Sequence, residues 1–331
     1  MPHILVAGKI HEAGIGLLTA VTGTTFDYVE EISVASIVSR IASADAIVLR
    51  TQPFTAETIG IAERLQIVSR HGVGYDAVDV DALTARSIPL AVVGDVNSQS
   101  VAEQTLMLML ALAKRTLKHD TATRTGQWDY RNRFDAFELS GKRLLLIGFG
   151  RIGKKVAALS KAFGMQVMAH DPYIGQEVIQ ATGVTPVHDL AAAFALADIV
   201  SLHIPRIGKE VPVGAGELAH MKPTAMLINT ARGGLVDETA LAAALAQGRL
   251  AGAGLDVFEA EPPAPDHPLF SSDRVVFTPH MAGLSQESAL RMSLSSVQNV
   301  VDFFAGRLNP DLVVNASKLS PDALHRWRRM S

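Results

Sequence analysis

Residues 144–153, LLLIGFGRIG, combine a short apolar run with three glycines in the spacing G-x-G-x-x-G. The residues that follow, KKVAALSKAFG, have a helical pattern, and VMAHD at 167–171 reads as a second strand that ends in an acid. A strand, a glycine-rich turn, a helix and an acidic strand end are the components of a dinucleotide-binding βαβ unit. This stretch therefore predicts a parallel sheet covered by helices, with a dinucleotide at one of its loops.

Each glycine and the acid has its own expected role at this loop. Gly148 permits the tight turn, Gly150 lets the backbone approach a pyrophosphate, and Gly153 allows the helix to pack closely on the strand. Asp171 would accept hydrogen bonds from a ribose 2′-hydroxyl and repel a 2′-phosphate, which favours NAD over NADP. The alternative is an ordinary βαβ unit without a ligand, because a glycine pattern alone is a weak signal.

Short apolar runs alternate with helix-length segments along most of the chain. The pattern predicts strands at residues 3–7, 25–29, 46–50, 67–70 and 90–93, and again at 144–147, 167–169, 199–202, 225–229, 252–257 and 275–278. A chain of 331 residues is also long enough for about two domains. We therefore expect an α/β protein with two doubly wound parallel-sheet domains.

Two long helical patterns set the expected domain boundaries. The segment 98–125 contains neither Gly nor Pro, and it is either a core helix or an arm that packs against a second subunit. The segment 285–305 follows the last strand and is expected to return to the N-terminal unit. The predicted domains are thus a discontinuous substrate domain, 1–99 with 284–331, and a cofactor domain, 100–283, with hinges near 97–100 and 281–284.

The composition argues against several classes of function. A net charge of −3 offers no basic surface for nucleic acid or an anionic membrane, and the basic run HRWRRM at 325–330 reads as a solvated tail. The apolar run TLMLMLALA at 105–113 is too short to span a bilayer, which takes about 20 residues. The chain has no cysteine and no metal-ligand spacing. We expect a soluble, cytoplasmic protein without a metal.

Three residues with anion-binding or acid–base side chains follow predicted strands. Arg232, Glu261 and His280 lie in NTARGG (229–234), DVFEAEPP (256–263) and TPHMAG (278–283). The guanidinium suits a carboxylate with an adjacent carbonyl, and the imidazole can carry a proton. A hydrogen bond to the carboxylate would fix the imidazole tautomer and favour the protonated ring. Taken singly, an Arg after a strand is more often a surface ion-pair residue, and a His there is as often a structural cap as a catalyst.

Together the quoted strings resemble the NAD-dependent D-isomer-specific 2-hydroxyacid dehydrogenases. The similarity covers GFGRIG, HDPY, NTARGGLVDE, GAGLDVFEAEPP and TPHMAG, with HGVGYDAVDVDA (71–82) and SVAEQTLML (100–108) in the first third. The resemblance implies hydride transfer between a D-2-hydroxy acid and NAD. It also implies that Arg232 binds the substrate carboxylate and carbonyl, and that His280, tuned by Glu261, is the acid/base.

The resemblance also implies a set of cofactor contacts and an architecture. Asp171 would hold the adenosine ribose, Asp256 would lie near the nicotinamide carboxamide, and His203 begins the family's HxPLT string, altered here to HIPRI. The remaining implied contacts are Thr230 and Ala231 at the nicotinamide and Arg151 and Ile152 at the pyrophosphate. A flavodoxin-like substrate domain, a Rossmann domain, an active-site cleft between them and a homodimer built on the long helix complete the expectation.

Residues of the first domain are expected to select the substrate. Arg50 ends AIVLR, and Arg70 and His71 lie in VSRHGVG. These cationic groups favour a substrate with a second anionic group, such as 3-phosphoglycerate, while backbone N–H groups near Val73 and Gly74 suit a carboxylate. Here the chain is most similar to phosphoglycerate dehydrogenases and hydroxypyruvate reductases, in a form without a C-terminal regulatory domain. The alternative is that both arginines form surface ion pairs.

Other functions share the fold and the cofactor site. An NAD-sensing regulator similar to the corepressors of the family would bind NAD without turnover. A glyoxylate or hydroxypyruvate reductase would need no second anion site, and a phosphite dehydrogenase would use the same Arg and His on a different anion. The complete set of Arg232, Glu261 and His280 favours an enzyme acting on a small 2-hydroxy or 2-keto acid.

Overall fold

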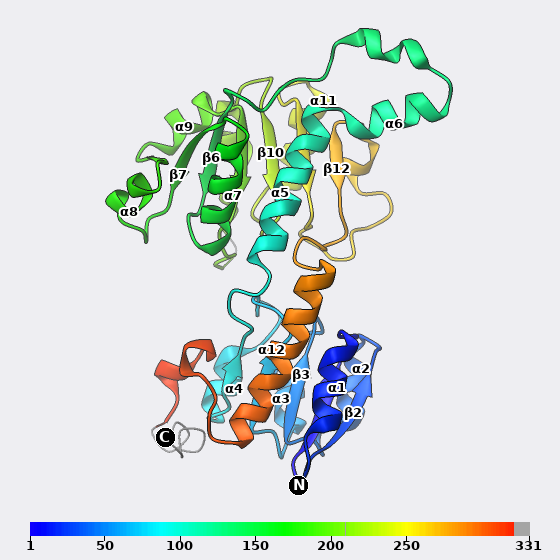
Figure 1. Ribbon diagram of the computed structural model, residues 1–331, viewed down its shortest axis with the longest axis vertical. Helices are drawn as coiled ribbons and strands as arrows, with labels where there is room; N and C mark the ends of the chain where they lie inside the picture. Colours follow the sequence, from blue (N-terminus) through cyan, green and yellow to red (C-terminus); the bar gives the residue numbers. More distant parts are fainter. Residues whose placement is uncertain (209, 321–331) are drawn as a thin grey trace. The chain divides into compact units, whose positions relative to one another are not determined.

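A computed structural model describes residues 1–208 and 210–320, and the chain divides into two compact units (Figure 1). Unit 1 comprises Met1–Asn97 and Leu284–Ser331, and unit 2 comprises Ser98–Gly283. The predicted basic tail at 325–330 and the end of the predicted substrate domain, 321–331, lie outside the described residues. Each unit contains one wholly parallel sheet, which confirms the predicted α/β class with two doubly wound domains.

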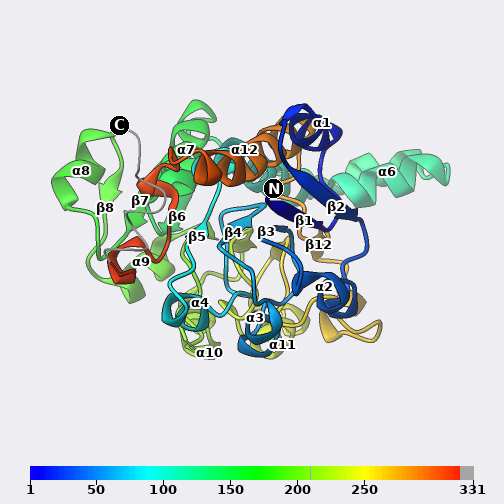
Figure 2. The same cartoon turned by 90° about the horizontal axis from the view of Figure 1, so that it is seen from below.

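Unit 1 has the strand order β2-β1-β3-β4-β5, the flavodoxin-like arrangement. Its strands are β1 (His3–Ala7), β2 (Thr25–Val29), β3 (Ala46–Leu49), β4 (Ile67–Arg70) and β5 (Leu90–Ala91). Helices cover both faces of this sheet, as Figure 2 shows. The first face carries α1 (Glu12–Ala20) and α12 (Gln286–Phe304), and the second carries α2 (Val34–Ile41), α3 (Ala56–Ile61) and α4 (Val80–Ala85). The short helices η3 (Pro310–Leu312) and η4 (Ala316–Lys318) follow α12.

Unit 2 has the order β12-β11-β10-β9-β6-β7-β8, which is the Rossmann order with one added strand. Its strands are β6 (Arg143–Ile147), β7 (Gln166–His170), β8 (Thr185–Pro186), β9 (Ile199–Leu202), β10 (Met226–Asn229), β11 (Gly252–Leu255) and β12 (Val275–Phe277). One face packs against α5 (Ser98–Ala113), α7 (Arg151–Ala162) and α8 (Gln176–Ala181), and the other against α9 (Leu190–Leu196), α10 (Ala215–His220) and α11 (Glu238–Ala246). The central strands are buried on both faces, so their sequences are largely apolar.

The single long helix predicted for residues 98–125 is wrong. The segment breaks into α5 and α6 (Thr116–Arg124), and Arg115 between them has a left-handed backbone with φ 51°. The N–H of Phe137 donates to the Ala113 carbonyl at 2.9 Å and so takes up an acceptor at the end of α5. That donor comes from the chain returning after η1 (Trp128–Arg133), so no local signal marks the break. In Figures 1 and 2, α6 extends away from the sheet of its unit.

None of the helices in the described part of the chain has the length and apolar character needed to cross a bilayer. Across residues 1–208 and 210–320, no group of three or more His, Asp or Glu side chains is arranged to hold a metal ion.

Candidate active site

The predicted chemical groups of unit 2 collect at one edge of its sheet. Because all seven strands are parallel, the loops after β6, β9, β10, β11 and β12 leave the sheet at the same edge. These loops carry the glycine pattern, the altered HxPLT string, Arg232, Glu261 and His280. Ligands of open α/β sheets bind at this edge, so the local geometry of each loop decides what it can hold.

The glycine loop has the geometry of a phosphate cradle. Gly148 has φ +97°, and a Cβ at this position would lie 2.5 Å from the carbonyl oxygen of His203. A Cβ on Gly153 would lie 2.3 Å from the carbonyl oxygen of Gly148, so the loop closes only with glycine at both places. Gly150 faces open space and precedes the first turn of α7, where backbone N–H groups are unsatisfied. These residues fit a dinucleotide pyrophosphate.

Asp171 is held in place by the same loop. Its Oδ2 accepts a hydrogen bond from the Phe149 N–H at 2.8 Å, and its Oδ1 accepts one from the Tyr173 N–H at 2.9 Å. Each carboxylate oxygen has two lone pairs, so both can still accept from a ribose hydroxyl. Arg151 is exposed and Ile152 is half-buried at the start of α7, beside the cradle.

His203 supports the cradle from inside the unit. Its Nε2 shares a hydrogen bond with Ser201 Oγ at 2.9 Å, its Nδ1 is buried without a partner, and burial lowers the pKa of His203 to about 3. The ring is therefore neutral, and the atom nearest to a Cβ placed on Gly148 is the backbone carbonyl oxygen of His203. Arg206, which replaces an apolar residue of the HxPLT string, donates from Nη1 to the Gly233 carbonyl at 3.4 Å.

The turn after β10 is organised by a residue that the sequence analysis did not single out. Asn229 donates from Nδ2 to the carbonyl of Arg232 at 2.8 Å and accepts from the N–H of Ala231 at 3.0 Å. The guanidinium of Arg232 donates from Nη1 to the Ala231 carbonyl at 2.6 Å. Thr230 is buried, and its Oγ1 lies 2.9 Å from Thr105 Oγ1 of α5. The turn is thus fixed on both sides while Arg232 is only half-buried.

His280 and Glu261 meet across two strand-end loops. His280 Nδ1 lies 2.6 Å from Glu261 Oε2, and the side chains are 52% and 35% exposed. Glu261 Oε1 accepts from the Phe258 N–H at 3.0 Å. Partial burial raises the pKa of Glu261, but the hydrogen bonds from His280 and Phe258 and the positive charges of His280 and Arg232 outweigh it and keep that pKa below its ordinary value. Glu261 engages Nδ1, which leaves Nε2 of an exposed ring for proton transfer.

Asp256 lies beneath His280 and does not face outward. It is fully buried and accepts hydrogen bonds from Thr278 Oγ1 and from the N–H groups of Met281 and Ala282, the latter two both at 2.9 Å. Burial raises the pKa of Asp256, although these hydrogen bonds act in the opposite direction. The His280 N–H donates to the Asp256 carbonyl at 2.7 Å, and His280 has φ +49°. The structure thus places Asp256 as the support of the turn that presents the imidazole.

The structure adds a second Glu–His pair at this edge. Glu238 Oε2 lies 2.8 Å from His267 Nε2, and both side chains are largely buried. The two residues are separated by 29 positions and share no local pattern, so sequence spacing alone could not pair them. The only sequence hint is that both belong to segments next to Arg232 and Glu261.

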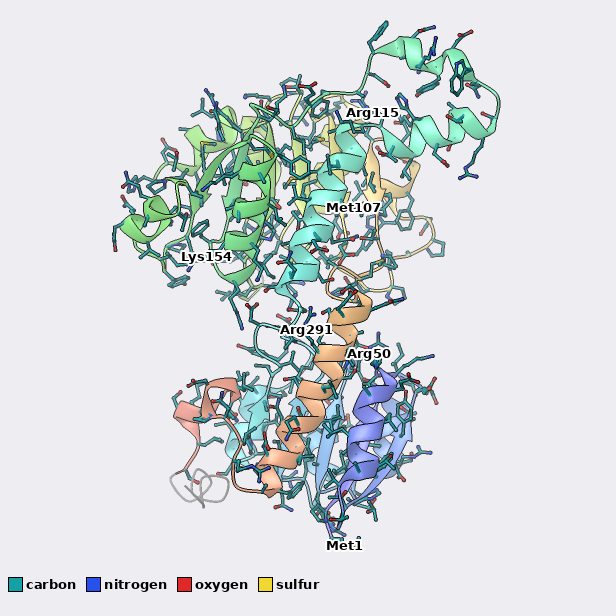
Figure 3. The ribbon with its side chains drawn as sticks, in the orientation of Figure 1. Met1, Arg50, Met107, Arg115, Lys154 and Arg291 are labelled. Atoms are coloured by element: carbon teal, nitrogen blue, oxygen red, sulfur yellow. The ribbon has the colours of Figure 1, made fainter. Side chains whose placement is uncertain are left out.

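In unit 1, the residues expected to select the substrate lie at the end of β4 and in the loops after β3 and β4. Arg50 directly follows β3 (Figure 3), and Arg70 Nη1 donates to the carbonyl of His71 at 2.7 Å. His71 is buried with Nε2 2.9 Å from Ser293 Oγ, and burial, followed by the charges of Arg50 and Arg70, lowers its pKa to about 4. His71 therefore does not add the positive charge that the sequence suggested. Val73 and Gly74 are half-buried in the loop that follows.

The sequence is similar to a known protein family and to known dehydrogenases and reductases. Residues 106–282 match the family described as D-isomer specific 2-hydroxyacid dehydrogenase, NAD binding domain. The D-3-phosphoglycerate dehydrogenase of Methanocaldococcus jannaschii is 38% identical over 99% of this chain and 62% of that protein. The glyoxylate reductase of Aeropyrum pernix is 35% identical over 94% of this chain and 96% of that protein.

The fold comparison agrees. The crystal structure of the TT0316 protein from Thermus thermophilus superposes with a TM-score of 0.87 at 31% identity, covering 94% of this chain and 99% of that one. The chain spans about three-fifths of the length of the phosphoglycerate dehydrogenases that it matches. On the match of residues 106–282 and of nearly the full length of a glyoxylate reductase, the chain belongs to the D-isomer-specific 2-hydroxyacid dehydrogenase family and carries its NAD-binding domain.

Proposed function

We propose that this protein interconverts a D-2-hydroxy acid and its 2-keto acid with NAD. The observation that carries the proposal is the 2.6 Å contact between His280 Nδ1 and Glu261 Oε2, on a side chain that is 52% exposed and whose Nε2 takes no part in that contact. In the direction of reduction, His280 Nε2 would donate a proton to the substrate carbonyl oxygen, and in oxidation it would accept the hydroxyl proton. Glu261 would orient the ring and stabilise its charge.

The same geometry supports Arg232 as the anion-binding residue. Its turn is fixed by Asn229, so the guanidinium is held near the edge at which His280 and Glu261 meet. A planar guanidinium can donate two parallel hydrogen bonds to a carboxylate and an adjacent carbonyl oxygen. We infer that Arg232 holds these two groups of the substrate, so that the carbonyl faces the His280 proton.

The cofactor would be held by the cradle of Gly148, Gly150 and Gly153 and by Asp171. When bound, NAD supplies the hydride acceptor, and NADH the hydride donor. The carboxylate of Asp171 is anchored by Phe149 and Tyr173, so it cannot easily turn away from a 2′-phosphate. We infer that the protein prefers NAD to NADP, and that Asp171→Ala would reduce that preference.

The test is NADH consumption with glyoxylate, hydroxypyruvate, phosphohydroxypyruvate and sulfopyruvate. We expect turnover of at least one of them, and loss of that turnover in His280→Ala with NADH binding retained. Tight NADH binding without turnover of any member of the panel would point instead to an NAD-sensing regulator. Loss of NADH binding in the His280→Ala variant would also contradict the assignment.

We further infer that the substrate carries a second anionic group, as 3-phosphoglycerate does. Arg50 and Arg70 both lie close enough to His71 for their charges to lower its pKa, so unit 1 concentrates positive charge after β3 and β4. Arg50→Ala should reduce kcat/KM for phosphohydroxypyruvate more than for glyoxylate. Equal loss for both substrates would favour a glyoxylate or hydroxypyruvate reductase, the first being the activity named for the Aeropyrum relative.

We propose that the protein is a homodimer in which α5, α6 and η1 pack against a second copy. Apolar side chains remain exposed along this segment: Met107 (Figure 3), Leu117, Trp128 and Phe134 are 38%, 57%, 65% and 87% exposed. An apolar groove of about 430 Å³ between α5 and α7 continues this surface. Sedimentation should give a dimer, and Phe134→Asp should shift it toward a monomer. A wild-type monomer at micromolar concentration would contradict the proposal.

A further inference from the structure

The second Glu–His pair lies beside the catalytic loops and is largely shielded from solvent. Glu238 is the first residue of α11, and His267 directly precedes η2 (Pro268–Ser271). The two side chains are 14% and 15% exposed, compared with 35% and 52% for Glu261 and His280. A carboxylate this buried is stable only with hydrogen bonds, and its place at a helix N-terminus favours its charge.

The hydrogen bonds of the pair assign the His267 tautomer. The Leu269 N–H donates to His267 Nδ1 at 3.3 Å, so Nδ1 is the unprotonated nitrogen. Nε2 therefore carries the hydrogen and donates it to Glu238 Oε2 at 2.8 Å. Glu238 Oε1 accepts from the Glu259 N–H at 2.7 Å. Both ring nitrogens and both carboxylate oxygens are thus engaged, which leaves this pair no open nitrogen for proton transfer.

The Glu238 contacts lead directly to the catalytic loop. Glu259 is two residues before Glu261, and the neighbouring Phe258 N–H donates to Glu261 Oε1 at 3.0 Å. The rings of Phe258 and His267 meet edge to face with centroids 5.6 Å apart. A Cβ on Gly233 would lie 1.7 Å from the Phe258 carbonyl oxygen, so the Arg232 turn packs directly on the same backbone. Residues 258–261 are therefore held by three neighbours: the Glu238 carboxylate, the His267 ring and the Gly233 backbone.

We propose that Glu238 and His267 are positioning residues that hold the 258–261 loop so that Glu261 stays within hydrogen-bond distance of His280. This inference deepens the proposed function and rests on it. Neither residue touches the reacting groups. Glu238 acts through the Glu259 N–H, and His267 keeps the Glu238 carboxylate oriented by occupying its second oxygen.

A purely structural role would stabilise the fold without affecting Glu261, so the test must separate the two. His267→Gln places an amide N–H near the former Nε2 and keeps the donor to Glu238, but it loses the acceptor for Leu269. His267→Asn places a carbonyl near the former Nδ1 and keeps the acceptor for Leu269, but it loses the donor to Glu238. The two variants are matched controls because each retains one half of the His267 contacts.

Glu238→Gln breaks the same contact from the other side. Its amide oxygen can still accept from the Glu259 N–H, but its NH2 group then faces the His267 Nε2–H, and two donors cannot bond. If His267→Asn fails to fold, this variant keeps the inference testable. His267→Asn and Glu238→Gln should both loosen the 258–261 loop and weaken the two hydrogen bonds that Glu261 accepts, from the Phe258 N–H and from His280.

The readout is the titration of the Glu261 carboxyl, followed by carbon NMR in the full chain, together with the pH profile of kcat. Charged or donating groups around Glu261 are His280, Arg232 and the Phe258 N–H, and all of them lower its pKa. In His267→Asn and Glu238→Gln, we expect the pKa of Glu261 to rise and the acid limb of the kcat profile to move to higher pH. We also expect kcat at neutral pH to fall about tenfold, a change whose free energy equals that of one pKa unit. His267→Gln should retain the wild-type titration.

An unchanged Glu261 titration in both His267→Asn and Glu238→Gln, or equal behaviour of the Gln and Asn variants at 267, would overturn the inference. The NMR measurement needs no turnover. If the wild-type protein reduces none of the 2-keto acids, the proposed function fails while the positioning role is still decided by the Glu261 titration.

Discussion

Two Glu–His pairs lie on neighbouring loops of unit 2, and they differ in what surrounds them. Glu261–His280 is 2.6 Å apart on half-exposed side chains, and Glu238–His267 is 2.8 Å apart on side chains that are about one-seventh exposed. In the first pair the carboxylate takes Nδ1 and leaves Nε2 open. In the second, a backbone N–H occupies Nδ1 while the carboxylate takes Nε2.

The difference shows that a Glu–His contact is not by itself a catalytic dyad. A ring with both nitrogens engaged cannot deliver a proton to a substrate without breaking a buried hydrogen bond, which costs about 1–3 kcal/mol. A ring with one open nitrogen can, provided that its other side is oriented. The turn around Asp256 supplies that orientation, because it holds the His280 backbone in a left-handed conformation at the strand end.

The largest difference in kcat should appear between two single variants, His280→Ala and His267→Ala. His280→Ala removes the only proposed proton carrier, so kcat should fall by about 10²- to 10⁴-fold, the usual contribution of general acid–base catalysis. Because the His280 side chain is half-exposed, the free energy of unfolding should change by less than about 0.5 kcal/mol. Steady-state kinetics and urea unfolding of the two variants provide the comparison. A His267→Ala variant with the greater loss of kcat would reverse the roles given to the pairs.

The contrast between the pairs also marks what the sequence could and could not reveal. Arg232, Glu261 and His280 each follow a strand in a local string, and parallel topology brings such strand ends to one edge, so their meeting was predictable. The Glu238–His267 pair is defined by contacts across 29 residues, with no periodicity to connect them. The break at Arg115 escaped prediction for the same reason, because the bond from Phe137 comes from a distant segment.

The local sequence pattern also did not predict how deeply individual polar side chains are buried. His71, His203 and Asp256 were assigned to ligand contacts from the strings around them. The side chains of His71 and Asp256 are buried and His203 is half-buried. Burial lowers the pKa of the two imidazoles and raises the pKa of the aspartate, while the ligand contacts of all three residues stay predictions. A string identifies the residue type and the loop, whereas the side-chain direction depends on packing from other elements.

A smaller effect is expected when the catalytic carboxylate is neutralised. In Glu261→Gln the amide oxygen can accept from His280 or from Phe258, but its NH2 group then faces the remaining donor. The loss of charge and of one hydrogen bond should reduce kcat by roughly ten- to a hundredfold, equivalent to one or two pKa units. The KM for the 2-keto acid should change little. A wild-type kcat in this variant would show that His280 works without its partner.

The buried pair should matter more for stability than for rate. His267→Ala leaves the Glu238 carboxylate with an unsatisfied oxygen in a largely buried position, which should lower the free energy of unfolding by about 1–3 kcal/mol. The accompanying loss of kcat should stay near the tenfold expected for His267→Asn, because both remove the donor to Glu238. Urea unfolding with an unchanged m-value measures the first quantity. A loss of stability equal to that of His280→Ala would remove the distinction between the pairs.

The smallest effect is the dependence of stability on pH. The pKa of Glu261 is depressed in the fold, so its charged form contributes stability that is present above the ordinary carboxyl pKa and is lost as the pH falls through the lower folded value. Because Glu261 is 35% exposed, solvent screening should limit the contribution to a few tenths of a kcal/mol. Wild type should therefore be slightly more stable than Glu261→Gln at pH 7, and the difference should vanish at pH values below the folded pKa. If the stability difference between wild type and Glu261→Gln instead grows as the pH falls, the charged Glu261 carboxylate is destabilised by its surroundings. The two pairs would then differ in whether their surroundings stabilise the carboxylate charge, as well as in exposure.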